Sequence, residues 1–285
     1  QRRSGESPLN VLLVPKLQFG NEKNKKNVLT FMNGWSILFW LIVSFLLMYP
    51  LKRWITAHIQ GVAFLLTGSP QVAMWLFWGL FLPGTLLHEL SHWLTAFLLG
   101  VRTSRFSLWP QMKKGGELQM GAVQVEMSDP FRHSLIGLAP LVFGSIAVLL
   151  IGQGRLELGR LGEALGSGDL EVIGPAMAQL LLVPDVLLWF YLIFAISNAM
   201  LPSASDRESW RTVLIYLTLA LALTIGLGLN PNVPAELQSF GLAIIAYLLS
   251  AFVITIVVDL FFILLIAFTE TLFAWMLGRR VQYNR

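Results

Sequence analysis

Long apolar stretches, each long enough to cross a bilayer, dominate this sequence of 285 residues. About 20 consecutive apolar residues span the hydrocarbon core of a bilayer as a helix. Segments of this kind lie at residues 28–49, 71–100, 132–151, 176–201, 210–229 and 237–278. Charged residues make up only 13% of the chain, about half the share that is usual in soluble domains. We therefore expect an all-α polytopic membrane protein with about six transmembrane helices.

The segments between the spans divide the chain into four expected regions. Residues 1–27 are polar and basic, and we expect them to form a cytoplasmic N-terminal arm. Residues 28–70 are expected to hold the first span, ended by Pro50, and then a segment in the membrane interface. A central core is expected at residues 71–211, and the C-terminal transmembrane helices at 212–285.

Three further segments carry structural expectations. Residues 101–109 and 117–127 alternate partly between apolar and polar side chains, and a Lys-Lys-Gly-Gly turn at 113–116 separates them, which predicts a small β-hairpin insertion. Residues 152–175 are rich in glycine and charge and are expected to be a loop. Residues 237–278 are apolar for about twice the length of one span, so either one long helix or two spans with a tight bend would fit.

Charge and cysteine content narrow the function classes. The net charge of +4 comes from basic residues beside the apolar spans, which is typical of membrane topology and not of nucleic-acid binding. The distribution predicts that both termini are cytoplasmic, and we expect a prokaryotic cell membrane as the location. The chain has no cysteine, so any metal must be held by His, Asp or Glu side chains.

The pentad His88-Glu89-Leu90-Ser91-His92 fits the H-E-x-x-H pattern of zinc-dependent hydrolases. On a helix, residues four apart share one face, so His88 and His92 can bind one Zn²⁺. Glu89 would lie beside the metal and act as the general base towards the water that the metal activates. Chance placement is the alternative, but three ionisable groups in an apolar helix carry a large insertion cost.

A third protein ligand is needed, and Asp206 is the preferred candidate. It follows the 176–201 span on the same predicted side as the pentad, and Pro202 should end the helix there and let the chain fold back. The alternative role of Asp206 is to cap the next helix. Asp185, Asp259 and Glu270 are weaker candidates, which we expect to be polar groups of the bundle interior or gating residues.

Three blocks of the sequence together resemble the site-2 protease family of intramembrane zinc metalloproteases. The first is the pentad helix, the second is residues 131–140 with Phe-Arg at the start and Leu-Ala-Pro at the end, and the third is Asn198…Pro202…Asp206. The blocks occur in the family's order and cover residues 71–211, roughly. The resemblance implies a zinc metalloendopeptidase that cleaves a membrane-protein substrate in or near a transmembrane segment.

The resemblance also suggests roles outside the metal ligands. Asn198 would steady the substrate backbone or the oxyanion, as a weak candidate for substrate binding. The hairpin would hold an unwound substrate by β-augmentation, although a purely structural hairpin fits the sequence equally well. The expected partners are the substrate and the lipid bilayer, without nucleic acid, and the sequence makes no prediction about oligomeric state.

Two other functions remain open at this stage. Arg207 follows Asp206 where the family usually has glycine, so the chain could bind zinc and act as a proteolytically silent membrane scaffold. Glu89 argues against this, because a silent site has no use for a general base. A transporter is the less favoured alternative, since no paired broken helices occur at matching positions.

Overall fold

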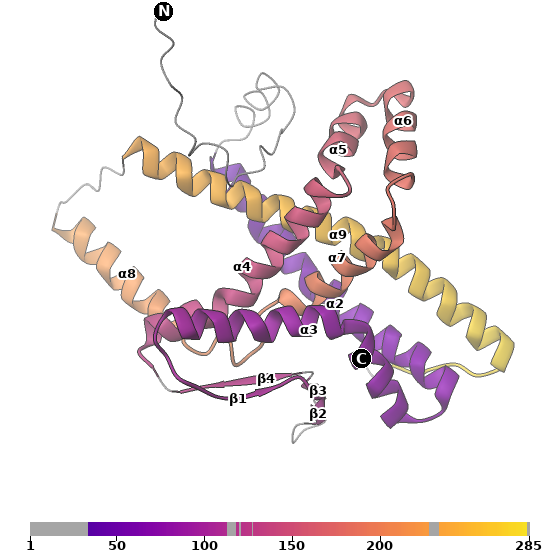
Figure 1. The fold of residues 1–285 in the computed structure, drawn as a ribbon. Coiled ribbons are helices and arrows are strands. Elements are labelled where there is room, and N and C mark those ends of the chain that lie inside the picture. Colours follow the sequence, from indigo (N-terminus) through magenta and orange to yellow (C-terminus); the bar gives the residue numbers. More distant parts are fainter. Residues whose placement is uncertain (1–33, 113–117, 120, 127, 228–233, 284–285) are drawn as a thin grey trace, which may run out of the picture.

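The structure is a computed structural model that describes residues 34–112, 118–119, 121–126, 128–227 and 234–283. Its elements, in chain order, are α2 (Gly34–Thr67), α3 (Pro70–Leu98), β1 (Thr103–Ser107), β2 (Gln111–Met112), β3 (Leu118–Gln119), β4 (Ala122–Val125), α4 (Pro130–Gly154), α5 (Leu158–Ser167), α6 (Leu170–Leu181), α7 (Val186–Met200), α8 (Trp210–Gly226) and α9 (Ala235–Leu277). Figure 1 shows a helical bundle with the small β-structure beside α3. The arm expected at residues 1–27 and the turn expected at 113–116 lie outside the described residues.

The prediction of an all-α polytopic membrane protein is confirmed. Among the described residues, α2, α3, α4 and α9 are each long and apolar enough to cross a membrane. The pair α6 and α7 makes a fifth span if the two are taken together. The total of four or five spans is fewer than the six expected. Large apolar side chains cover the outer helix faces, such as Leu264, Phe268 and Trp275 on α9, and only lipid solvates such a surface well.

The first span differs from its prediction. Pro50 does not end it, because α2 continues for 17 residues beyond that proline to Thr67. A proline removes one backbone hydrogen bond, and membrane helices tolerate this where neighbouring elements compensate. The polar side chains that suggested an interfacial segment after residue 50 instead belong to a transmembrane helix, and several of them face an internal cavity described below.

The region between α4 and α7 is more helical than expected. Residues 152–175 were predicted to be a loop, but they include α5 and the start of α6, which project from the bundle as a pair in Figure 1. Leu158, Leu161 and Ala164 recur at helical spacing and turn towards the core, which outweighs the glycine content. Pro184 lies in the bend between α6 and α7, where the two helices meet at 87°.

The last transmembrane segment is one continuous helix. With 43 residues, α9 is about 65 Å long, roughly twice the thickness of the hydrocarbon core. It must therefore tilt strongly or extend beyond the bilayer. It packs chiefly along α2 and also contacts α4 and α7, so it holds these three helices together.

The core forms where α3, α4 and α7 cross. Residues 193–200 of α7 are all buried, and Phe194 packs against Phe81 of α3 with ring centroids 5.5 Å apart. Small residues allow the backbones to approach closely, as is usual between membrane helices. A Cβ at Gly84 would collide with the carbonyl oxygen of Ala195, so this glycine brings α3 and α7 into direct backbone contact.

The expected β-hairpin is present and lies along α3. Strands β1 and β4 pair antiparallel, with Phe106 opposite Val123 and Ser107 opposite Ala122. The short strands β2 and β3 continue the ribbon towards its tip. Near the tip, the indole Nε1 of Trp78 on α3 donates a hydrogen bond of 2.6 Å to the carbonyl of Leu108, which ties the hairpin to the helix.

Candidate metal centre

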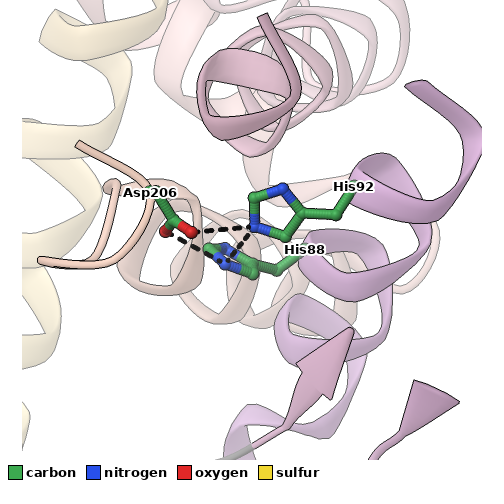
Figure 2. Close-up of side chains that lie close together, drawn as sticks. All are labelled: His88, His92 and Asp206. Carbon is green, nitrogen blue, oxygen red and sulfur yellow. Dashed lines mark hydrogen bonds and ion pairs between the residues drawn. The ribbon is translucent and has the colours of Figure 1, made fainter. Parts of the chain in front are cut away.

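Helix α3 presents two imidazoles on one face. His88 and His92 are one helical turn apart, and their Nε2 atoms lie 3.1 Å from each other. Figure 2 shows both rings directed towards the carboxylate of Asp206, which comes from the loop between α7 and α8. The side chains of His88 and His92 are only 15% and 9% exposed, so the three groups meet in the interior of the protein.

Backbone carbonyls fix which nitrogen of each imidazole faces the centre. His88 Nδ1 lies 2.8 Å from the carbonyl oxygen of Ala199, and His92 Nδ1 lies 2.8 Å from that of Ile136. A carbonyl only accepts hydrogen bonds, so each Nδ1 carries the proton and donates it. Both Nε2 atoms are then free to donate a lone pair to a metal, which is the usual arrangement around metal-bound histidine.

The loop after α7 positions the carboxylate of Asp206. Pro202 follows the last turn of α7 and turns the chain back, as the sequence predicted. The backbone N–H of Ser203 donates to Asp206 Oδ2 at 2.6 Å, which orients the carboxylate towards the imidazoles. Asp206 Oδ1 lies 3.2 Å from His92 Nε2, and Oδ2 lies 3.7 Å from His88 Nε2. Ser209, and not Asp206, occupies the N-cap position of α8, and its side chain makes no capping hydrogen bond.

The surroundings of Asp206 favour its anionic form. Burial alone would raise the pKa of this carboxyl group, because desolvation penalises charge. When no metal occupies the centre and the imidazoles are protonated, a hydrogen bond from His92 Nε2, the charges of His92 and His88 and the N–H of Ser203 outweigh burial and hold the pKa of Asp206 below its usual range. Asp206 therefore supplies a carboxylate at neutral pH, which a metal ligand must be.

The three donor atoms have the spacing that one metal ion requires. They all lie within 4.8 Å of one another. Bonds of about 2.0–2.2 Å at tetrahedral angles place neighbouring ligand atoms roughly 3.3–3.6 Å apart. The two Nε2 atoms lie 3.1 Å apart, His92 Nε2 lies 3.2 Å from Oδ1 of Asp206, and His88 Nε2 lies 3.7 Å from Oδ2, so each separation is close to that range. His88, His92 and Asp206 can therefore hold a metal ion, and two imidazoles with one carboxylate suit zinc.

Glu89 lies beside this centre and not within it. Its carboxylate is buried and accepts a hydrogen bond from the backbone N–H of Val123 on β4. Gly121 also packs on it, and a Cβ at that position would lie 2.9 Å from Glu89 Oε1. The hairpin therefore fixes the carboxylate next to the two histidines, where it can exchange protons with a ligand at the centre.

A cavity of about 960 Å³ opens onto the three donor atoms and Glu89. Its walls come from α2, α3, the hairpin at residues 121–123 and the loop at residues 203–207. The volume falls within the usual size range of ligand sites and can admit water and a stretch of polypeptide. The metal centre therefore lies on an accessible cavity inside a membrane bundle.

The other sequence candidates lie apart from the centre. The amide of Asn198 donates to Asp259 Oδ1 at 2.7 Å and to the carbonyl of Phe194, within the contact between α7 and α9 and away from the cavity wall. Asp185 is exposed in the bend before α7. Glu270 accepts a hydrogen bond from Tyr283 Oη at 2.7 Å. Asp259 and Glu270 thus have hydrogen-bond partners within the protein, whereas the exposed position of Asp185 shows that it is not a group of the bundle interior.

Sequence reasoning missed one wall of the site. Lys52, Thr56 and Gln60 on α2 line the same cavity as the metal centre. They were assigned to an interfacial segment because Pro50 was expected to end the helix. Their spacing of four residues places them on one helix face, and this signal could have identified them.

Gly137 allows α4 to pack directly against the backbone of the Asp206 loop. A Cβ at this position would collide with the carbonyl oxygen of Asp206. Gly137→Ala is therefore expected to displace the loop and weaken zinc binding by about 10–100-fold, as loss of supporting contacts does at other metal sites. Gly154→Ala in the same helix is the control, because nothing lies within 4 Å of that position. Equal zinc affinity of both variants, measured by competition with a chelator, would contradict this role.

Comparisons with protein-family models, curated proteins and solved structures find no match for this chain. The functional conclusion therefore depends on the geometry of the centre, the cavity around it and the resemblance of the three sequence blocks.

Proposed function

We propose that this protein is an intramembrane zinc metalloprotease that hydrolyses a peptide bond in or near a transmembrane segment of a membrane-protein substrate. The observation that carries the proposal is the convergence of His88, His92 and Asp206 on one point, with Glu89 beside it, on a cavity within the bundle. The resemblance to site-2 proteases supports the same assignment, because the three donors are the residues that the matching blocks supply.

The chemistry divides between the metal and Glu89. A zinc ion held by the three donors would lower the pKa of a water molecule towards neutrality and polarise the scissile carbonyl. Glu89 takes a proton from the attacking water and later passes it to the leaving amine. The hairpin packs against the carboxylate of Glu89 at Gly121, which limits where this side chain can move beside the centre.

The substrate must be extended where it is cut, because a helix shields its own peptide bonds. Strand β4 pairs with β1 on one side, and its residues Ala122 and Val123 line the cavity. An unwound substrate segment can add to β4 by β-augmentation and present its peptide bond to Glu89. Asn198 has no place in this scheme as a direct substrate contact, since it lies away from the cavity wall.

The test uses the purified full-length protein in detergent, loaded with zinc, and a pool of single-span membrane peptides. Mass spectrometry should find cuts within or near the spans, which disappear with 1,10-phenanthroline and return when zinc is added back. Stoichiometric zinc without cleavage of any peptide would instead favour the silent scaffold, and the protease assignment would then be wrong.

A further inference from the structure

A row of polar side chains runs along one face of the transmembrane helix α2. Lys52, Thr56 and Gln60 follow each other at intervals of four residues, and all three line the cavity of the metal centre. A lysine in the middle of a membrane helix has an insertion cost of about 2.5–3.5 kcal/mol. The row therefore calls for a function that uses polar groups at membrane depth.

Lys52 lies near the middle of α2, roughly 22–27 Å of helix from either end. It lines the cavity of the metal centre. Within the part of the chain that the structure describes, Lys52 forms no hydrogen bond or ion pair. Its ammonium group interacts electrostatically with Asp206 and Asp259 at longer range. The charge is thus held in the cavity without a direct partner among the described residues.

The charges around the cavity favour an anionic ligand once a metal is bound. Among the described residues, the cationic side chains in its wall are Lys52 and Arg207 and the carboxylates are Glu89 and Asp206, so these charges balance. A divalent ion would leave a surplus of about two positive charges. Arg207 is already engaged, because its Nε donates to the carbonyl of Ser203 and its guanidinium lies over the Tyr49 ring. Lys52 is free to meet a ligand.

We propose that Lys52 binds the carboxylate of an acidic residue in the substrate segment and so selects where the substrate is cut. This inference rests on the proposed function. The row from Lys52 to Phe64 extends for about 18 Å, which accommodates roughly five residues of extended chain. A substrate that runs along β4 past Glu89 occupies the same cavity, so an acidic side chain on it can reach the ammonium group. Thr56 and Gln60 offer hydrogen bonds to the adjoining substrate backbone.

The test measures binding in a background that cannot cut the ligand. Full-length Glu89→Gln protein, in nanodiscs of phosphatidylcholine with zinc at pH 7, is titrated with two fluorescent single-span peptides of Leu and Ala. Both have a central Gly-Pro helix break, and they differ only in an adjacent Asp or Asn. We expect the Asp peptide to bind about tenfold more tightly, a typical effect of one partly desolvated charge pair. In the Lys52→Gln variant, the ratio of the two peptide affinities should fall to about one.

Two further variants separate the role of Lys52 from a general effect of charge. Lys52→Arg should keep the preference, and so should Arg53→Gln, which removes an exposed charge from the next position. Three outcomes would overturn the proposal. The preference for the Asp peptide could survive in Lys52→Gln, the Lys52 protein could bind both peptides equally, or it could bind neither. So would a Lys52-dependent preference for phosphatidylglycerol vesicles with equal peptide binding, which would assign the charge to a lipid headgroup.

Zinc is measured in every preparation of this series. Preparations without zinc would contradict the proposed metalloprotease, while the ratio of the two peptide affinities would still decide on Lys52. Equal zinc content in Lys52→Gln and its parent, together with a lost preference, is the result that we expect. It would show that Lys52 recognises the ligand and does not support the metal.

Discussion

Replacing Glu89 with Gln is expected to lower the rate of peptide cleavage by about 10²–10⁴-fold, the usual contribution of a general base. Glutamine has nearly the same size and can still accept the hydrogen bond from Val123 through its carbonyl oxygen. It cannot take a proton from the attacking water. Because Glu89 lies outside the three donor atoms, the variant should still bind one zinc per chain. Initial cleavage rates and zinc content, measured on one preparation, check both parts.

The matched control for this change is Glu126→Gln. Glu126 lies just beyond β4 on the same hairpin, is exposed, and does not line the cavity. The Glu126→Gln variant should cleave the peptides at the rate of the unmodified protein. If Glu89→Gln cleaved as fast as this control, another group would be the base. If Glu89→Gln lost its zinc as well, Glu89 would be a ligand or a structural support of the centre.

Asp206→Asn is expected to weaken zinc binding by more than about 100-fold, which exceeds the usual effect of losing a supporting contact. The substitution preserves shape but removes the negative charge that lies 3.2 Å from His92 Nε2. An amide oxygen is a much poorer zinc ligand than a carboxylate. Two imidazoles alone would then hold the ion, and cleavage should fall with zinc occupancy. Competition with a chelator of known affinity measures the change.

Glu208→Gln is the control for the Asp206 loop. Glu208 is exposed, two residues further along the same loop, and is not part of the cavity wall. The zinc affinity of the Glu208→Gln variant should equal that of the unmodified protein. Unchanged affinity in Asp206→Asn would remove Asp206 from the ligand set, and the third donor would then have to come from another residue or from water.

The placement of the candidate metal ligands could be predicted from the sequence because it follows from local rules. A spacing of four residues places His88 and His92 on one helix face wherever that helix lies. Asp206 required one step more, namely that Pro202 ends α7 on the side where the pentad lies. The structure brings these groups together as that reasoning expected. The sequence of residues 237–278 is compatible with one helix or two, and in the structure the segment forms the single helix α9.

Other features depended on contacts between distant segments and could not be predicted. Pro50 is a helix breaker by its local chemistry, but the packing of α2 along α9 keeps the helix continuous around it. The glycine-rich stretch after α4 forms helices because Leu158 and Leu161 find partners in the core. The role of Lys52 follows only when α2 is continuous, since the cavity that it lines lies between α2 and α3.

The most direct test of the account is X-ray absorption at the zinc edge on the purified, metal-loaded protein. Two imidazole nitrogens at about 2.0–2.1 Å and a carboxylate oxygen at about 2.0–2.2 Å are the expected protein ligands. His92→Ala should lose one of the imidazole contributions together with most of the zinc affinity. A protein that binds no zinc, or a spectrum without imidazole ligands that His92→Ala leaves unchanged, would contradict the metal centre and with it the proposed protease.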